Sequence, residues 1–200
     1  MGLPTPETEE AMRTLRFFVE PSTNLENPPW KTTPIDKIEK SLTDIVHRAW
    51  FERIWTVQEA TLARRMTLVS GQHEISWDVS FRTMKRILFR IKSAVISPDW
   101  STLHLSRASV LDWTPLVNIL DAQIRQAARR ESATIDRTPL DLAFDFRTRK
   151  STDPRDKYFA IFSIVENDHG GRIVVQPDYT ITLEELHKQF VAAIERVNDI

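Results

Sequence analysis

Hydrophobic residues recur every three or four positions along most of this chain, a spacing typical of helices that bury one face. Helix start signals reinforce the spacing: Ser80 or Asp78 can cap one helix, and Thr182 with Glu185 matches the capping box before another. The pattern predicts helices over Thr8–Val19, from Asp36 to Ala49, over Phe81–Ile91, Pro115–Glu131, Pro139–Phe146 and Asp153–Val165, and from Thr182 to about Val197.

Strand-like patterns are short and few. Met66–Val69 and His73–Trp77 are separated by Ser70 and Gly71, which predicts two strands joined by a turn. Arg172–Val175 predicts a further strand. We therefore expect an α/β fold that is dominated by helices and has few short strands.

The segment from Trp50 to Ala63 is apolar over a wide arc, so we expect one continuous helix buried on more than one side. Glu59 follows Trp55 by one turn, which places a carboxylate beside an indole. A buried or half-buried acid of this kind is typical of a group whose pKa is tuned for chemistry. The residues expected to be mostly buried are Trp50, Ile54, Trp55, Val57 and Leu62.

Composition narrows the function classes. A chain of 200 residues is long enough for one domain, and its formal charge of −1 gives no electrostatic footprint for nucleic acid. The absence of cysteine excludes thiol nucleophiles and zinc-thiolate sites, and the five histidines have no metal-ligand spacing. No stretch approaches the roughly 20 apolar residues of a membrane helix. We therefore expect a cytoplasmic protein with no metal, no nucleic-acid partner and no membrane partner.

Three separated segments carry a family resemblance. Phe51-x-Arg53-x-Trp55-Thr56-x-Gln58-Glu59 with Leu62-Ala63 strongly resembles the central motif of the fungal heterokaryon incompatibility (HET) domain. Ser151–Ala160 and then Pro177–Tyr179 match later motifs of that family in the same order. We call Phe51–Ala63, Ser151–Ala160 and Pro177–Tyr179 the three motif segments.

The resemblance implies that residues 1–200 are a single HET domain, incomplete and covering its central to C-terminal part. It also implies a partial layered core like that of Toll/interleukin-1 receptor (TIR) domains, lacking its N-terminal strands. The implied role is non-self recognition that leads to programmed cell death in a fungus. Trp55–Glu59 resembles the Trp-Cys-x-x-Glu helix of TIR domains, with Thr56 in place of the cysteine.

In TIR domains that cleave NAD, the matching glutamate is catalytic. The resemblance therefore implies Glu59 as catalytic residue and Trp55 as substrate-binding residue, with no cofactor and with NAD as substrate. The alternative is a signalling module without enzyme activity that associates with itself or with protein partners.

Two motif features also have plainer interpretations. Glu59 can simply pair with Arg53, Arg64 or Arg65, as most helical glutamates do. The run from Asp153 to Lys157 can offer its cations to an anion, or it can be a helix start with Asp153 as cap and Pro154 in the first turn. We favour the helix start because these residue types suit that position.

Overall fold

The computed structural model describes residues 5, 7–99, 112–131, 139–168 and 176–198. The strand expected at Arg172–Val175 lies outside the described residues. The described elements are α1 Thr8–Val19, the 3-10 helix η1 Pro29–Lys31, α2 Ile35–Val46, α3 Ala49–Glu52, α4 Trp55–Leu62, β1 Arg65–Ser70, β2 His73–Asp78, α5 Phe81–Val95, α7 Thr114–Arg130, α8 Pro139–Phe146, α9 Asp156–Asp168 and α10 Leu183–Asn198. This confirms a mixed, helix-dominated α/β fold with few short strands.

The two strands form an antiparallel hairpin, β1 with β2, in which Ser70 pairs with His73. Gly71 begins the two-residue connection with φ of 60°, a backbone conformation that costs glycine little. Leu68 and Ile75 face each other in the ladder and are both buried, so this face of the hairpin joins the core. Among the described residues, β1 has β2 as its only strand partner.

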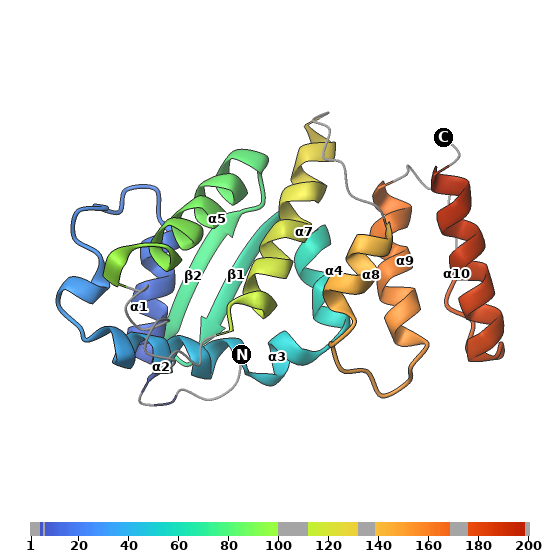
Figure 1. The fold of residues 1–200 in the computed structure, drawn as a ribbon, viewed down its shortest axis with the longest axis horizontal. Helices are drawn as coiled ribbons and strands as arrows, with labels where there is room; N and C mark the ends of the chain where they lie inside the picture. The colour runs from blue at the N-terminus through green and yellow to red at the C-terminus, as the bar shows by residue number, and fades with distance from the viewer. Residues whose placement is uncertain (1–4, 6, 100–111, 132–138, 169–175, 199–200) are drawn as a thin grey trace.

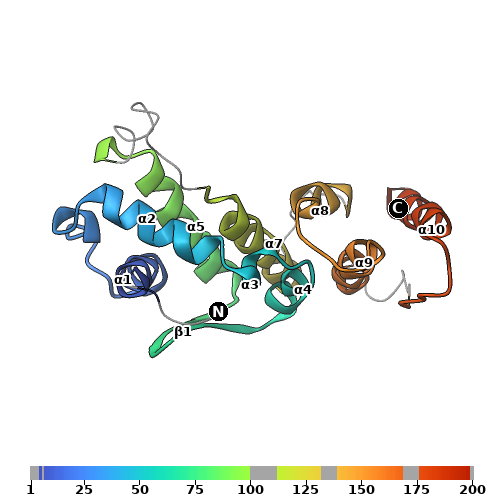
Figure 2. The ribbon, with the colours of Figure 1, turned by 90° about the horizontal axis from the view of Figure 1, so that it is seen from below.

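The helices are arranged in two groups (Figure 1). The hairpin packs against α1, and α5 lies against both α1 and α7. At the other end of the chain, α9 packs against α8 and α10, and Figure 2 shows these three helices to one side of the hairpin. Helix α4 contacts both α7 and α9, so it connects the two groups.

Arginine side chains close the C-terminal end of α1. Arg90 donates hydrogen bonds to the carbonyl groups of Phe17, Phe18 and Glu20, and Arg86 donates to that of Val19. The carbonyls of Phe17, Phe18 and Val19 lie in the last turn of α1, where no later N–H of the helix can reach them, so the two arginines satisfy them and tie α5 to α1. Burial lowers the pKa of Arg90, and the neighbouring charge of Arg86 lowers it further.

The expectation of one continuous helix from Trp50 to Ala63 is wrong, because the segment forms two helices. Arg53 has an extended backbone, with φ of −78° and ψ of 138°, and it separates α3 from α4. Ile54 and Val57 are buried as expected. Trp50, Trp55 and Leu62 are only partly buried. Trp55 and Leu62 lie on α4, which has packing partners on some of its sides and solvent on another.

Candidate functional site

The first two motif segments meet through the backbone at the break between α3 and α4. Arg53 and Lys150 form an isolated parallel bridge, in which the N–H of Ile54 donates to the carbonyl of Lys150 at 3.0 Å. The N–H of Lys150 donates in turn to the carbonyl of Glu52, and its Nζ lies 2.6 Å from Glu52 Oε2. Lys150 directly precedes the second motif segment, so this bridge fixes the two segments against each other.

The second and third motif segments are joined by side chains. Arg155 donates to both carboxylate oxygens of Asp153 and to the carbonyls of Tyr179 and Ile181. The hydroxyl of Tyr179 donates to Asp156 Oδ1 at 2.7 Å. The hydrogen bonds from Arg155 lower the pKa of Asp153 and raise that of Arg155, while the bond to Asp156 raises the pKa of Tyr179. The third segment is therefore held on the start of α9.

This geometry supports the helix-start interpretation of Asp153–Lys157. Asp153 Oδ1 accepts from the backbone N–H of Arg155, although the α-helix itself begins two residues after Pro154. The Nζ of Lys157 donates to the carbonyl of Arg147. The two cations that an anion would need are thus engaged with the chain itself.

Buried contacts fix α4 in place. Val57, Ala60 and Thr61 are buried, and Gln123 of α7 donates from Nε2 to the carbonyl of Ala60 at 2.9 Å. Thr56, at the position where the resembled families have cysteine, is 1% exposed and donates from Oγ1 to the carbonyl of Arg53 at 2.7 Å. A hydroxyl can make this short bond at the turn into α4, which gives Thr56 a structural role.

The opposite face of α4 is open. Arg53, Trp55, Gln58, Glu59 and Leu62 line a depression of about 470 Å³, which we call the motif depression. Arg53 and Glu59 are exposed, whereas Trp55 and Gln58 are partly buried. The polar side chains of Arg53, Gln58 and Glu59 make no hydrogen bond or ion pair with another described residue. The motif depression therefore holds a guanidinium, an amide and a carboxylate beside a partly buried indole, and none of the three polar groups bonds another described residue.

Two expectations about Glu59 can be compared with the structure: that its side chain is buried or half-buried, and that it pairs with a nearby arginine. Its side chain is exposed rather than buried, because it lies on the solvent side of α4. It forms no ion pair with Arg53, Arg64 or Arg65 within the described residues. Glu59 also borders a second depression of about 280 Å³, lined by Trp50, Ala60 and residues 66–69 of β1. The Glu59 carboxylate therefore lies between the two depressions, and a ligand in either one can contact it.

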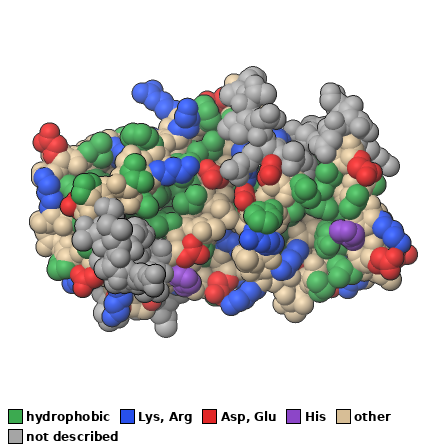
Figure 3. Space-filling model, in the orientation of Figure 1, with side chains coloured by type: hydrophobic (Ala, Val, Ile, Leu, Met, Phe, Trp, Pro, Cys, Tyr) green, Lys and Arg blue, Asp and Glu red, His purple; other side chains and the backbone are tan. Residues whose placement is uncertain are grey.

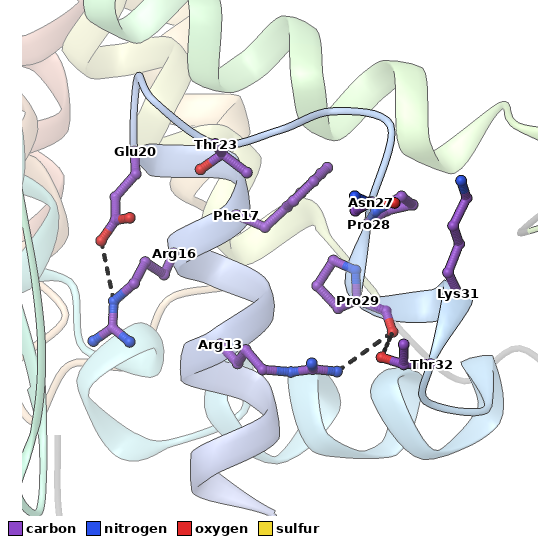
Figure 4. Close-up of a pocket in the computed structure, with 10 residues that line it drawn as sticks. All are labelled: Arg13, Arg16, Phe17, Glu20, Thr23, Asn27, Pro28, Pro29, Lys31 and Thr32. Atoms are coloured by element: carbon purple, nitrogen blue, oxygen red, sulfur yellow. Dashed lines mark hydrogen bonds and ion pairs between the residues drawn. The ribbon is translucent and has the colours of Figure 1, made fainter.

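Another cavity, of about 370 Å³, lies between α1 and the connection that leads to η1 (Figure 4). Two of its cations are engaged: Arg13 bonds Glu10 and the carbonyl of Pro29, and Arg16 pairs with Glu20.

Sequence reasoning did not anticipate the burial of Arg149. This side chain is 5% exposed, donates to the carbonyl of Pro115 at 2.7 Å and lies over the ring of Phe146. Burial lowers its pKa to about 10. An isolated arginine between two helical segments carries no local signal of burial, because its environment is made by α7 and α8 together.

Within the described residues, no group of three or more His, Asp or Glu side chains is placed to hold a metal ion. The described histidines are His47, His73 and His187, and His187 Nδ1 lies 3.2 Å from the hydroxyl of Tyr158. His104 and His169 lie outside the described residues.

Comparisons of this chain with protein-family models, with curated proteins and with solved structures found no match. The resemblance to HET and TIR domains therefore stays a prediction that the three motif segments carry.

Proposed function

We propose that this chain acts in fungal heterokaryon incompatibility, as a signalling protein whose activation leads to programmed cell death, and that the motif depression is its working surface. The observation that carries the proposal is the set of polar groups around that depression. The side chains of Arg53, Gln58 and Glu59 make no hydrogen bond with another described residue, although the backbone of their segment is held by the bridge to Lys150 and by the bond from Gln123 to Ala60. Polar groups held in place without a structural partner are suited to a ligand.

The chemistry that fits these groups is cleavage of the N-glycosidic bond of NAD. Water adds to the ribose carbon that bears nicotinamide, nicotinamide leaves with the bonding electron pair, and ADP-ribose and a proton complete the products. The Glu59 carboxylate stabilises or captures the oxocarbenium-like ribose that forms as the bond breaks. Trp55 offers an aromatic face to the nicotinamide ring, and Arg53 offers a guanidinium to the phosphates.

The exposure of Glu59 supports a second candidate. In an open depression water screens the carboxylate, so its effect on a developing cation is small unless another surface covers it. A module without enzyme activity, which binds a protein partner or a further copy of the chain over the motif depression, needs no such cover. Its carboxylate and guanidinium then serve as recognition groups rather than as a catalyst.

One substitution separates the two candidates. Glu59→Gln keeps the size of the side chain and removes its charge, and Glu9→Gln is a matched control because Glu9 is an exposed helical glutamate with no described partner. Each variant is expressed at equal level in the full-length protein, with NAD, nicotinamide and cell viability followed together.

The enzymatic proposal expects NAD loss and cell killing to fall together for Glu59→Gln alone. Killing that persists at unchanged NAD would remove the enzymatic function and favour the interaction module. If Trp55→Ala abolishes killing while NAD stays constant in every variant, the result would also favour the interaction module.

A further inference from the structure

The outer face of α5 combines basic and apolar residues in an unusual way. Around the helix axis, Arg82, Lys85, Phe89, Lys92 and the following Ile96 fall within an arc of about 80° at 100° per residue. The opposite side of α5 is buried in the core, including Met84, Ile87 and Ile91, so this arc is the surface of the molecule. We call these five residues the α5 face.

Two large apolar side chains project from the α5 face. Phe89 is 71% exposed and Ile96 is 79% exposed, the highest values among the exposed large hydrophobic residues described. Figure 3 shows hydrophobic and basic side chains side by side where α5 lies. Such exposure has a cost in water, because each side chain keeps apolar area hydrated that a partner could cover.

The charge of the α5 face has one sign. Helix α5 contains no Asp or Glu, and Arg82, Lys85 and Lys92 form no ion pair with a described residue. Lys85 instead lies over the ring of Phe81, with Nζ 5.0 Å from its centroid. The nearest acid identified by a bond is Glu131, which accepts from the N–H of Phe81 at the start of the helix and so lies at the end of the face.

We propose that the α5 face binds an anionic lipid surface, with the three cations on the headgroups and with Phe89 and Ile96 inserted between them. Lys and Arg side chains close to a bilayer are attracted to anionic headgroups, and apolar side chains beside them can enter the boundary between headgroups and acyl chains. Around the helix axis Phe89 and Ile96 lie at the middle of the arc, with Lys85 and Lys92 on one side of them and Arg82 on the other, so both apolar side chains can enter a surface whose anionic groups the cations contact. A bilayer also needs no pocket to receive projecting side chains, since lipids move aside for them.

This inference changes one expectation from the sequence. The expectation of no membrane partner rested on the lack of a spanning segment, and no described helix is long and apolar enough to cross a membrane. Binding at the surface of a bilayer needs no spanning segment. The α5 face and the motif depression lie on different elements, so lipid binding does not depend on the function proposed for Glu59.

The experiment uses the full chain with vesicles of phosphatidylcholine alone and of phosphatidylcholine with phosphatidylserine, and it measures binding by co-sedimentation. Binding is expected only to the anionic vesicles and should weaken as salt is added. Lys85→Gln with Lys92→Gln should lower the affinity about 25-fold, at about fivefold for each cation near a charged surface. Lys40→Gln with Lys188→Gln is the matched control, because both lysines are exposed and lie on other helices.

The apolar contribution is tested with Phe89→Gln and Ile96→Gln together. These changes should lower binding to anionic vesicles, whereas Phe144→Gln, at an exposed phenylalanine of α8, should not. Circular dichroism should show that each variant keeps its helices, since none of these side chains is buried.

The proposal is overturned if anionic vesicles do not sediment the protein, or if the control variants lose binding as much as the α5 variants. Binding to polyglutamate in solution without binding to vesicles would also overturn it, and would indicate an acidic protein as partner.

Discussion

Replacing Ile54 by alanine should destabilise this chain more than replacing the much larger Trp55. Ile54 is 1% exposed and lies at the junction of α3 and α4, where its N–H is tied to Lys150. Ile54→Ala removes three buried carbon atoms, about 2.4 kcal/mol at about 0.8 kcal/mol each. The cavity left behind raises the loss of unfolding free energy to about 3–4 kcal/mol.

Trp55 has a different environment, because one side of its indole faces the motif depression. An indole that stays partly in water gains less from folding than a buried one, so Trp55→Ala should cost about 1–2 kcal/mol rather than the 3–5 kcal/mol of a core tryptophan. The order of the two losses is thus the reverse of the order of side-chain size.

Urea unfolding followed by circular dichroism measures both losses. Tryptophan fluorescence is less suitable, because the chain has six tryptophans and one variant removes one of them. Equal m-values for the variants and the wild type are required before the losses are compared. Ile54→Val is the graded control and should cost about 1 kcal/mol. A loss for Trp55→Ala equal to or above that for Ile54→Ala would refute the reasoning, since Trp55 would then be a core residue and the motif depression would be closed on that side.

Three further predictions concern the elements that hold the motif segments and the hairpin. Tyr179→Phe removes the hydroxyl that donates to Asp156, a carboxylate that is only 9% exposed. Urea unfolding should therefore show that the free energy of unfolding falls by about 1–2 kcal/mol, and an unchanged value would mean that water replaces the bond fully. Asp153→Asn should destabilise at neutral pH, because the bonds from Arg155 lower the folded pKa of Asp153; its difference from the wild type should begin to shrink as pH falls below the ordinary carboxyl value of about 3.8 and vanish only below the folded pKa. A difference that stays constant with pH would contradict this. Gly71→Ala should lower the free energy of unfolding by about 1–2 kcal/mol, since alanine is disfavoured at φ of 60°; an unchanged urea midpoint would show that the turn adopts another conformation.

Local chemistry explains what could be predicted from the sequence. Ser80 accepts from the N–H of Thr83 at the start of α5, as its position before an apolar repeat indicates. Thr182 and Glu185 exchange the two hydrogen bonds of a capping box at the start of α10. Each of these features depends on residues within one turn, so the sequence pattern contains the whole signal.

The break at Arg53 could not be predicted in this way. The residues on both sides of it suit a helix, and the extended conformation is favoured by pairing with Lys150, a residue far along the chain. The exposure of Glu59 could not be predicted from the sequence either. Helical periodicity shows which residues share a face of α4, but only the positions of α7 and α9 decide which face they leave open.

The sequence indicated which residues lie together in the candidate site better than it indicated their exposure and their neighbours. Trp55 and Glu59 do line one depression, as the spacing of one turn indicates. The addition of Arg53 depends on the break before α4, because an unbroken helix would turn this side chain elsewhere. The links between Arg155 and Tyr179 required the structure as well, since the sequence shows only that both lie in motif segments.

The central motif segment divides its residues between folding and surface chemistry, and this division makes the functional test informative. Ile54, Thr56 and Val57 have buried contacts, so changes there alter stability and any activity together. Arg53 and Glu59 have exposed side chains with no described partner, so their substitution should leave the free energy of unfolding nearly unchanged. A loss of cell killing at Glu59 with unchanged stability therefore reports on what the motif depression binds or cleaves. The same loss accompanied by a lower melting temperature would show instead that Glu59 helps to hold α4, and the depression would no longer be supported as a working surface.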